Sequence, residues 1–261
     1  LPESIGAYTN VPLALAVITF FMLAAGTNFS LYYAALDQRS MRALHRNVEF
    51  RLYIGIFLVA TAAIVLDLAL ERALPLQDAI QHAAFQVASI QTTTGFTSID
   101  YDTWPNLSRG VLLALMVVGG CAGSTAGGLK VVRALVAAKY ASRHIRLAVS
   151  PRLVIPVRLD SQVLSDRMVS TVVGIVFIYA LGSLAGFILM CALGLDIVSA
   201  LSATLACISN VGPGMGMVGP VQNYAFIPAV GKLGLTLLML IGRLEFVSVL
   251  ALLYPMFWRW R

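Results

Sequence analysis

The chain has 261 residues, of which 59% are hydrophobic and 11% charged, with a formal net charge of +6 at pH 7 and a mean hydropathy of +0.86. Soluble domains carry about 25% charged residues, so this composition argues against a water-soluble globule, a disordered chain and a nucleic-acid-binding domain. Long unbroken apolar runs, in place of the alternating strands of a β-barrel, predict an all-α polytopic membrane protein.

The first apolar run, residues 11–36, is long enough to cross a bilayer, which takes about 20 apolar residues. A polar and basic segment follows it, up to about residue 51. The sequence begins with Leu1, Pro2 and Glu3 and lacks both an initiator Met and a cleavable leader pattern. We therefore interpret the chain as part of a longer protein.

A long apolar helix is predicted over residues 52–70, and a shorter segment follows over residues 76–91. The shorter segment is too short and too polar to cross a bilayer against lipid, and it leads into a Thr-Thr-Thr-Gly turn at Gly95. A segment that dips into a membrane and turns back is tolerated where it lines a protected aqueous path. We therefore predict a re-entrant half-helix that ends just before Gly95.

The next apolar run, residues 111–118, is interrupted by a glycine-rich stretch over residues 119–128, and an amphipathic basic segment continues to about residue 147. Clustered glycines break a helix. A phosphate-binding loop is not indicated, because Leu129 precedes Lys130 and no Ser or Thr follows that Lys. The stretch predicts either a flexible constriction in a water-filled path or close helix packing by small residues.

The second half repeats this order, with a charge-free run over residues 168–195, a short segment over residues 196–209 that leads into a turn at Gly212, and a last apolar run over residues 233–257. Gly95 and Gly212 are 117 positions apart, and the same offset brings the starts of the long and short helices close to their counterparts. An internal repeat governs a fold prediction. We predict one unit, consisting of a long helix, a short helix, a glycine turn and a long helix, that occurs twice.

The basic residues predict the orientation. If the short helices enter from outside, 14 of the 18 Lys and Arg residues lie on the inner side, three lie outside, and Arg243 lies within the last apolar run, as the positive-inside rule requires. The outer aspartates either concentrate cations or are solvated loop residues. An Arg at bilayer depth faces a cavity or a partner, so Arg243 is either a positive barrier in an ion path or a tether between helices.

The two glycine turns have the chemistry of a cation site. Helix C-termini carry partial negative charge, glycine reaches positive φ and so turns successive carbonyls inward, and carbonyl oxygens replace part of a cation's hydration shell. Thr92, Thr93 and Thr94 add neutral oxygens, which favour easily dehydrated monovalent ions over Mg²⁺. A plain turn between helices is the alternative. The sequence contains no catalytic triad, paired carboxylates or metal-ligand spacing, so we do not predict an enzyme.

The sequence resembles the Trk/Ktr/HKT superfamily of potassium transport proteins, most closely the bacterial TrkH membrane subunits, in the segments QTTTGFTSIDYDTWP, GGCAGSTAGGLKVVR, SNVGPGMG and IGRLEFVSVLALLYPMFWR. The resemblance implies helix–pore helix–helix (M1-P-M2) repeats around one pore. It implies that residues 1–47 are the second helix of a preceding repeat with an inner loop, 48–147 the third repeat, 148–165 a cytoplasmic linker and 166–261 the fourth repeat.

On the matching positions, the resemblance assigns a selectivity filter to the two glycine turns and a gate to the glycine-rich loop and the late Arg. The implied filter residues are Thr93, Thr94, Gly95, Asn210, Val211 and Gly212. The implied gate residues are Gly119, Gly120, Gly123, Ser124, Thr125, Gly127, Gly128 and Arg243.

The resemblance further implies transport of K⁺ across the bacterial inner membrane with no organic cofactor. The implied partners are membrane lipid, upstream pore repeats of the same protein, a second copy in a homodimer and a cytosolic nucleotide-binding regulatory subunit of the TrkA type, with no nucleic acid. Two alternatives stay open. Broken helices also build the sites of coupled transporters, which would make the protein an H⁺- or Na⁺-coupled potassium symporter, and the chain alone could be a non-conducting fragment.

Overall fold

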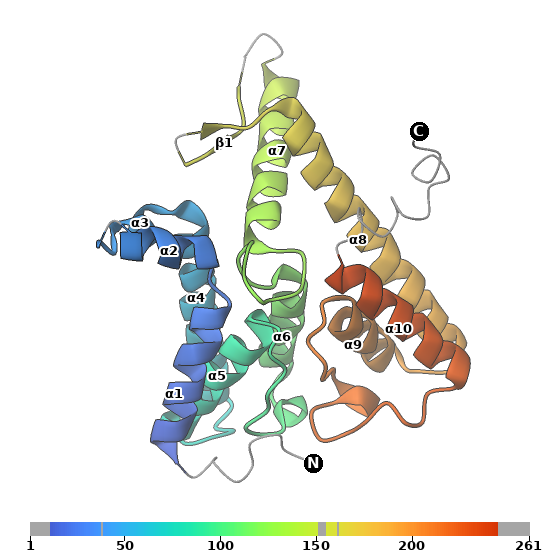
Figure 1. The fold of residues 1–261 in the computed structure, drawn as a ribbon. Helices are drawn as coiled ribbons and strands as arrows, with labels where there is room; N and C mark the ends of the chain where they lie inside the picture. Colours follow the sequence, from blue (N-terminus) through green and yellow to red (C-terminus); the bar gives the residue numbers. More distant parts are fainter. Residues whose placement is uncertain (1–10, 38, 151–154, 161, 245–261) are drawn as a thin grey trace.

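The computed structural model describes residues 11–37, 39–150, 155–160 and 162–244, and these residues are mostly helical (Figure 1). The helices are α1 (Pro12–Ala25), α2 (Phe29–Asp37), α3 (Arg42–Arg46), α4 (Val48–Leu70), α5 (Leu76–Gln91), α6 (Asn106–Val118), α7 (Val131–Val149), α8 (Asp166–Ala192), α9 (Ile197–Ile208) and α10 (Ala229–Arg243). The 3₁₀ turns are η2 (Tyr101–Thr103) and η3 (Gly216–Val218). The all-α prediction holds apart from one short antiparallel hairpin, β1 (Arg158–Leu159) with β2 (Gln162–Val163).

Helices α4 and α8 are long and apolar enough to cross a membrane, and α1 with α2 makes a third candidate span if the bent pair is one crossing. Both long helices expose large apolar side chains, such as Val59 on α4 and Phe177 on α8. Water would penalise such faces, whereas lipid does not. The predicted membrane location is therefore confirmed among the described residues.

The predicted helix over residues 11–36 is not continuous. The chain breaks after Ala25, and α1 and α2 meet at an angle of 89°. The break is held by hydrogen bonds from the glycine-rich loop, in which the Cys121 N–H donates to the Gly26 carbonyl over 2.9 Å and the Phe29 N–H donates to the Gly123 carbonyl over 3.1 Å. The prediction of one unbroken helix is wrong, because partners distant in sequence replace the helical hydrogen bonds there.

The two short helices lie among the longer ones, α5 in one half of the fold and α9 in the other, with α6 between them (Figure 1). Helix α5 has the predicted bounds, and it lies among α1, α4 and α6, while α9 lies among α8, α10 and α6. Residues 85–91 of α5 and 199–208 of α9 are buried apart from the half-buried Leu201. The short segments are therefore the core elements around which the longer helices pack.

One apolar cluster joins the two halves of the chain. Tyr101, Leu112 and Met116 from the first unit pack with Ala206 and Val211 from the second. Burial of such side chains contributes about 1.5–3 kcal/mol each. The contact fixes the end of α9 against α6, so the turns that follow α5 and α9 are brought together.

Helix α7 leads from the glycine-rich loop to the hairpin and the start of α8 (Figure 1). Val136, Val157 and Val169 form a small core between α7, the segment before β1 and α8. The predicted last helix is described only as far as Leu244, and the remainder of the predicted run, including Glu245, lies outside the described residues.

Candidate functional site

The turns after α5 and α9 lie against each other. Gly95 has a φ of +77°, and a Cβ there would overlap the Val211 carbonyl oxygen and lie 3.1 Å from Pro213 Cδ. Gly212 has a φ of +110°. Glycine is required at Gly95 both for its conformation and for this close approach.

The two turns have the same backbone geometry at the predicted offset of 117. Thr93 and Asn210 both have positive φ, +54° and +58°. The Thr94 N–H donates to the Ser89 carbonyl and the Val211 N–H donates to the Ala206 carbonyl, both over 2.8 Å. Left-handed conformations at non-glycine residues are uncommon, so their recurrence indicates one structural device present twice.

Some polar groups in the two turns already have hydrogen-bond partners within the protein. The hydroxyls of Thr92 and Thr94 are 2.7 Å apart, and the Gly212 carbonyl accepts from the Tyr224 hydroxyl over 2.8 Å. Within the described residues, no hydrogen bond ends on the backbone carbonyl oxygens of the other five filter residues. These are Thr93, Thr94, Gly95, Asn210 and Val211. Val211 is buried, and the other residues are half-buried, so these oxygens have no partner within the described protein and are available to a ligand or to water.

The glycine-rich loop contacts both turns. The Gly127 N–H donates to the Thr93 hydroxyl over 2.7 Å, and the Gly128 N–H donates to the Ser209 carbonyl over 3.1 Å. A Cβ at Gly127 would overlap the same Ser209 oxygen. The loop therefore reaches the turns by backbone contacts that a larger residue would block.

Arg243, at the end of α10, is brought to the same loop. Its Nη1 donates to the Thr125 carbonyl over 3.0 Å. Arg243 and the loop residues 122–128 line a cavity of about 360 Å³, together with Lys130 and Arg133. All the predicted gate residues thus lie in one loop or against it, and the lining of the cavity beside them includes three basic side chains.

Glu49 belongs to this site and is missing from the sequence-based prediction. It lies in the first turn of α4, is 6% exposed, and its carboxylate accepts from the Ala122 N–H over 2.6 Å. In the sequence Glu49 reads as one acid of a polar, basic segment, and nothing local distinguishes it. Its burial beside the loop is a tertiary property.

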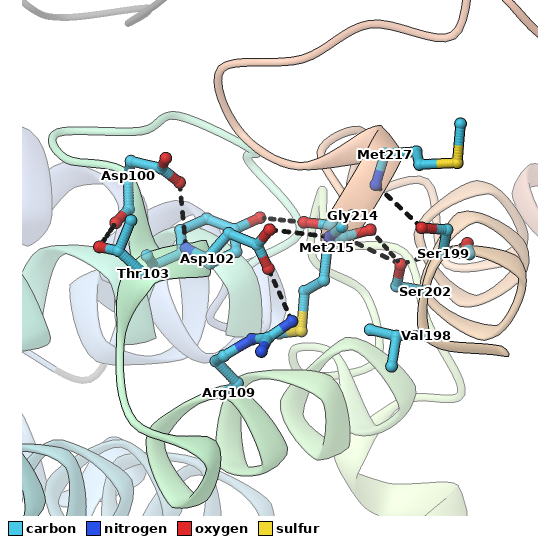
Figure 2. Close-up of polar contacts among 12 residues, drawn as sticks. Asp100, Asp102, Thr103, Arg109, Val198, Ser199, Ser202, Gly214, Met215 and Met217 are labelled. Atoms are coloured by element: carbon cyan, nitrogen blue, oxygen red, sulfur yellow. Dashed lines mark hydrogen bonds and ion pairs between the residues drawn. The ribbon is translucent and has the colours of Figure 1, made fainter. Parts of the chain in front are cut away.

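On the other side of the turns, the first unit clamps the second (Figure 2). The Asp102 carboxylate pairs with Arg109 at 2.8 Å and accepts from the Gly216 N–H over 3.0 Å. The Tyr101 hydroxyl donates to the Gly214 carbonyl over 3.0 Å. Burial raises the pKa of Tyr101, so its hydroxyl stays protonated and able to donate. The segment after Gly212 is thus fixed from outside its own unit.

Two of the outer aspartates accept hydrogen bonds from backbone N–H groups at the start of a helix. Asp67 accepts from the Ser108 N–H over 2.9 Å at the start of α6, and Asp196 accepts from the N–H groups of Val198 and Ser199 at the start of α9. Asp196 is thus the N-terminal cap of α9, whereas Asp67 belongs to α4 and bonds to the first turn of α6 from another helix. Asp67 and Asp102 are half-buried and hydrogen-bonded, while Asp196 is exposed to solvent, so each of these acids has a structural partner and the two interpretations of the outer aspartates stay open.

Comparison with known proteins identifies the family to which the chain belongs. The model of the TrkH family, described as a cation transport protein, matches residues 1–259. The chain belongs to the TrkH family. Named relatives include the Trk system potassium uptake protein TrkH of Salmonella typhimurium, 36% identical over 97% of the chain and 52% of the relative. That of Escherichia coli K12 is 37% identical over 98% of the chain and 53% of the relative.

The fold agrees with this family. The crystal structure of the potassium transporter TrkH from Vibrio parahaemolyticus has a TM-score of 0.90 and 34% identity, with 98% of this chain and 55% of that chain covered. The chain therefore spans about half the length of the TrkH relatives that it matches. These relatives are named for potassium uptake and not for a chemical reaction, which supports the expectation that the chain is not an enzyme.

Proposed function

We propose that the chain forms part of a potassium pore in the bacterial inner membrane. It supplies two M1-P-M2 repeats, residues 48–147 and 166–261, joined by a cytoplasmic linker over residues 148–165, and residues 1–47 supply the second helix of a preceding repeat. The repeat is supported by the equal backbone geometry at Thr93 and Asn210. The cargo is inferred from the TrkH relatives, which are named as potassium uptake proteins.

The selectivity filter in this proposal consists of Thr93, Thr94, Gly95, Asn210, Val211 and Gly212. The observation that carries it is the direct contact of Gly95 with the Val211 carbonyl, because this contact puts both half-helix ends at one place. The unpaired carbonyl oxygens there replace part of the hydration shell of K⁺. Because the Gly212 carbonyl is bonded to Tyr224, we assign the ion contacts of the second turn to Asn210 and Val211.

The gate in this proposal is the glycine-rich loop with Arg243. The residues are Gly119, Gly120, Gly123, Ser124, Thr125, Gly127, Gly128 and Arg243. Contacts from Gly127 and Gly128 to the filter turns support a loop that closes the path beneath the filter. The positive charge of Arg243 raises the barrier for a cation in the adjoining cavity, and its hydrogen bond to Thr125 holds the loop. Barrier and tether are thus two functions of one side chain.

The remaining partners are proposed from the family. Upstream repeats of the same protein complete the wall of the pore, a second copy forms a homodimer within the lipid, and a nucleotide-binding subunit of the TrkA type acts from the cytosol. Helix α7 connects the gate loop with the cytosolic side and carries basic residues towards its end. It is the element of this chain through which such a subunit would reach the gate.

Ion flux into vesicles that contain the natural protein carrying this sequence tests the proposal. K⁺ and Rb⁺ are expected to enter faster than Na⁺ and Li⁺, and entry should follow the potassium gradient alone. Equal entry of all four ions would refute the filter. Strict dependence on an imposed H⁺ or Na⁺ gradient would replace the pore with a coupled symporter, and the absence of any flux would indicate a non-conducting subunit.

A further inference from the structure

A second cavity lies where the end of α7 meets the segment before β1. Its volume is about 250 Å³. Helix α7 contributes Lys139, Ser142, Arg143 and Arg146, and residues 155–158 form the opposite wall. The α7 residues are spaced by three and four positions and so share one helix face. The cavity is separate from the proposed ion path, because it shares no lining residue with the cavity at the gate loop.

The cavity carries excess positive charge. Lys139 Nζ donates to the Arg158 carbonyl over 2.8 Å, and Arg143 pairs with Asp166 at 3.0 Å. No carboxylate pairs with Arg146 or Arg158 within the described residues. The buried Nε of Arg143 lacks a hydrogen-bond partner in the same part of the chain. Arg146 and Arg158 are exposed to solvent, whereas the Arg143 Nε is a buried donor that is costly to leave unsatisfied. A basic hollow that contains such a donor favours an anionic ligand.

In the orientation that we propose for the chain, the cavity lies at the boundary between membrane and cytosol. Asp166, the partner of Arg143, is the first residue of the span-length helix α8. Apolar side chains at the adjoining helix ends are exposed, namely Val149 at the end of α7 at 80% and Met168 in the first turn of α8 at 59%. Basic cavities at this level on the cytoplasmic side hold the headgroups of anionic lipids.

We propose that this cavity binds the phosphate group of an anionic membrane lipid. Guanidinium groups bind phosphate oxygens through two parallel hydrogen bonds, and Arg146 and Arg158 approach from opposite walls. The volume lies below the roughly 300–1,000 Å³ of cavities that enclose whole drug-sized ligands, so it suits a headgroup whose acyl chains stay outside. Because α7 begins three residues after Gly128, a bound lipid would fix the helix that leads from the gate loop.

Native mass spectrometry of the natural protein carrying this sequence, in detergent with phosphatidylglycerol added, tests the proposal. Arg146→Gln and Arg158→Gln are each expected to weaken retention of the lipid by about fivefold, since one basic residue near an anionic surface contributes about 1 kcal/mol. Arg42→Gln is the matched control, because Arg42 is exposed on α3 and outside the cavity. Circular dichroism verifies that each variant keeps its helical content.

Two further ligands distinguish the sources of phosphate. Phosphatidylcholine, which is uncharged overall, should be retained weakly and equally by all variants, and inorganic phosphate should not displace phosphatidylglycerol. Displacement by inorganic phosphate would make the cavity a free-anion site and overturn the lipid assignment. Equal retention of phosphatidylglycerol by the parent protein and both cavity variants would overturn the site itself. Neither result depends on whether K⁺ is the transported ion.

Discussion

The Thr93 hydroxyl accepts a hydrogen bond from the Gly127 N–H over 2.7 Å, so a residue of the first glycine turn is bonded directly to the glycine-rich loop. Filter and gate, as we propose them, are therefore adjacent structures that share a bond. If the loop moves away from the turns, this hydrogen bond breaks and the Thr93 hydroxyl loses the Gly127 N–H as its donor.

Thr93→Val is expected to loosen the loop. Valine keeps the shape of threonine but leaves the Gly127 N–H without a partner, at a cost of about 1–3 kcal/mol. The expected results are a lower melting temperature and a higher basal Rb⁺ flux in vesicles. Thr93→Ser, which keeps the hydroxyl, should behave as the parent does. Equal flux in the valine and serine variants would show that this bond does not restrain the loop.

Glu49→Ala is expected to release the other side of the same loop. The Glu49 carboxylate holds the Ala122 N–H at 2.6 Å in a buried position. Its loss should raise basal Rb⁺ flux, whereas Glu49→Gln, which keeps a carbonyl acceptor, should retain most of the closure. A glutamine variant as active as the alanine variant would mean that the charge of Glu49, and not its hydrogen bond, is what matters.

The short helices could be predicted from the sequence to within one residue at all four of their ends. Polar residues within 76–91 and the Thr-Thr-Thr-Gly turn after them indicate a short helix and its end. The repeat at an offset of 117 extends this prediction to α9. The signals are local there, because each turn contains a glycine with positive φ, Gly95 or Gly212. The positive φ of Thr93 and Asn210 could not be predicted in this way.

The break between α1 and α2 could not be predicted in this way. Gly26, Thr27 and Asn28 lie within an apolar run, and hydropathy alone favours one helix. The break depends on the donors Cys121 and Thr125, about 100 residues away. The burial of Glu49 and the bond from Gly216 to Asp102 could not be predicted from the sequence for the same reason, because each residue's partner is distant in sequence.

Asp196→Ala is expected to destabilise α9 in a pH-dependent way. Hydrogen bonds from the Ser199 side chain and from backbone N–H groups lower the pKa of the Asp196 carboxyl. A lowered folded-state pKa stabilises the fold above the unfolded value of about 3.9, and this stabilisation is lost as the pH falls through the folded value. At pH 7 the loss of the cap should cost about 0.5–2 kcal/mol.

Melting temperatures of the parent and Asp196→Ala measure this effect. The difference should be full at pH 7 and shrink below about pH 4, where the unfolded carboxyl becomes protonated. Asp196→Asn, which caps helices nearly as well, should lose less at pH 7 and show a flatter pH dependence. A constant difference down to pH 3 would exclude the ionised carboxylate as the cap.

Gly95→Ala is expected to destroy selectivity or folding. The added methyl group would overlap the Val211 carbonyl, and the φ of +77° is strained for alanine. Gly55→Ala is the control, since no atom lies within 4 Å of a Cβ there and Gly55 lies within α4. The ratio of Rb⁺ to Na⁺ flux should fall towards one for Gly95→Ala and stay at the parent value for Gly55→Ala. A parent-like ratio in both variants would contradict the filter.

Arg243→Ala is expected to raise basal Rb⁺ flux by about tenfold, the effect of lowering a barrier by about 1.4 kcal/mol. The alanine removes both the positive charge beside the cavity and the bond to the Thr125 carbonyl. Arg243→Gln separates the two, because its amide can still donate to Thr125 while its charge is gone. If charge sets the barrier, glutamine should raise flux as much as alanine does. If the bond holds the loop, glutamine should stay near the parent, and only alanine should leak. A rise with alanine alone would therefore assign Arg243 to restraining the loop rather than to repelling the ion.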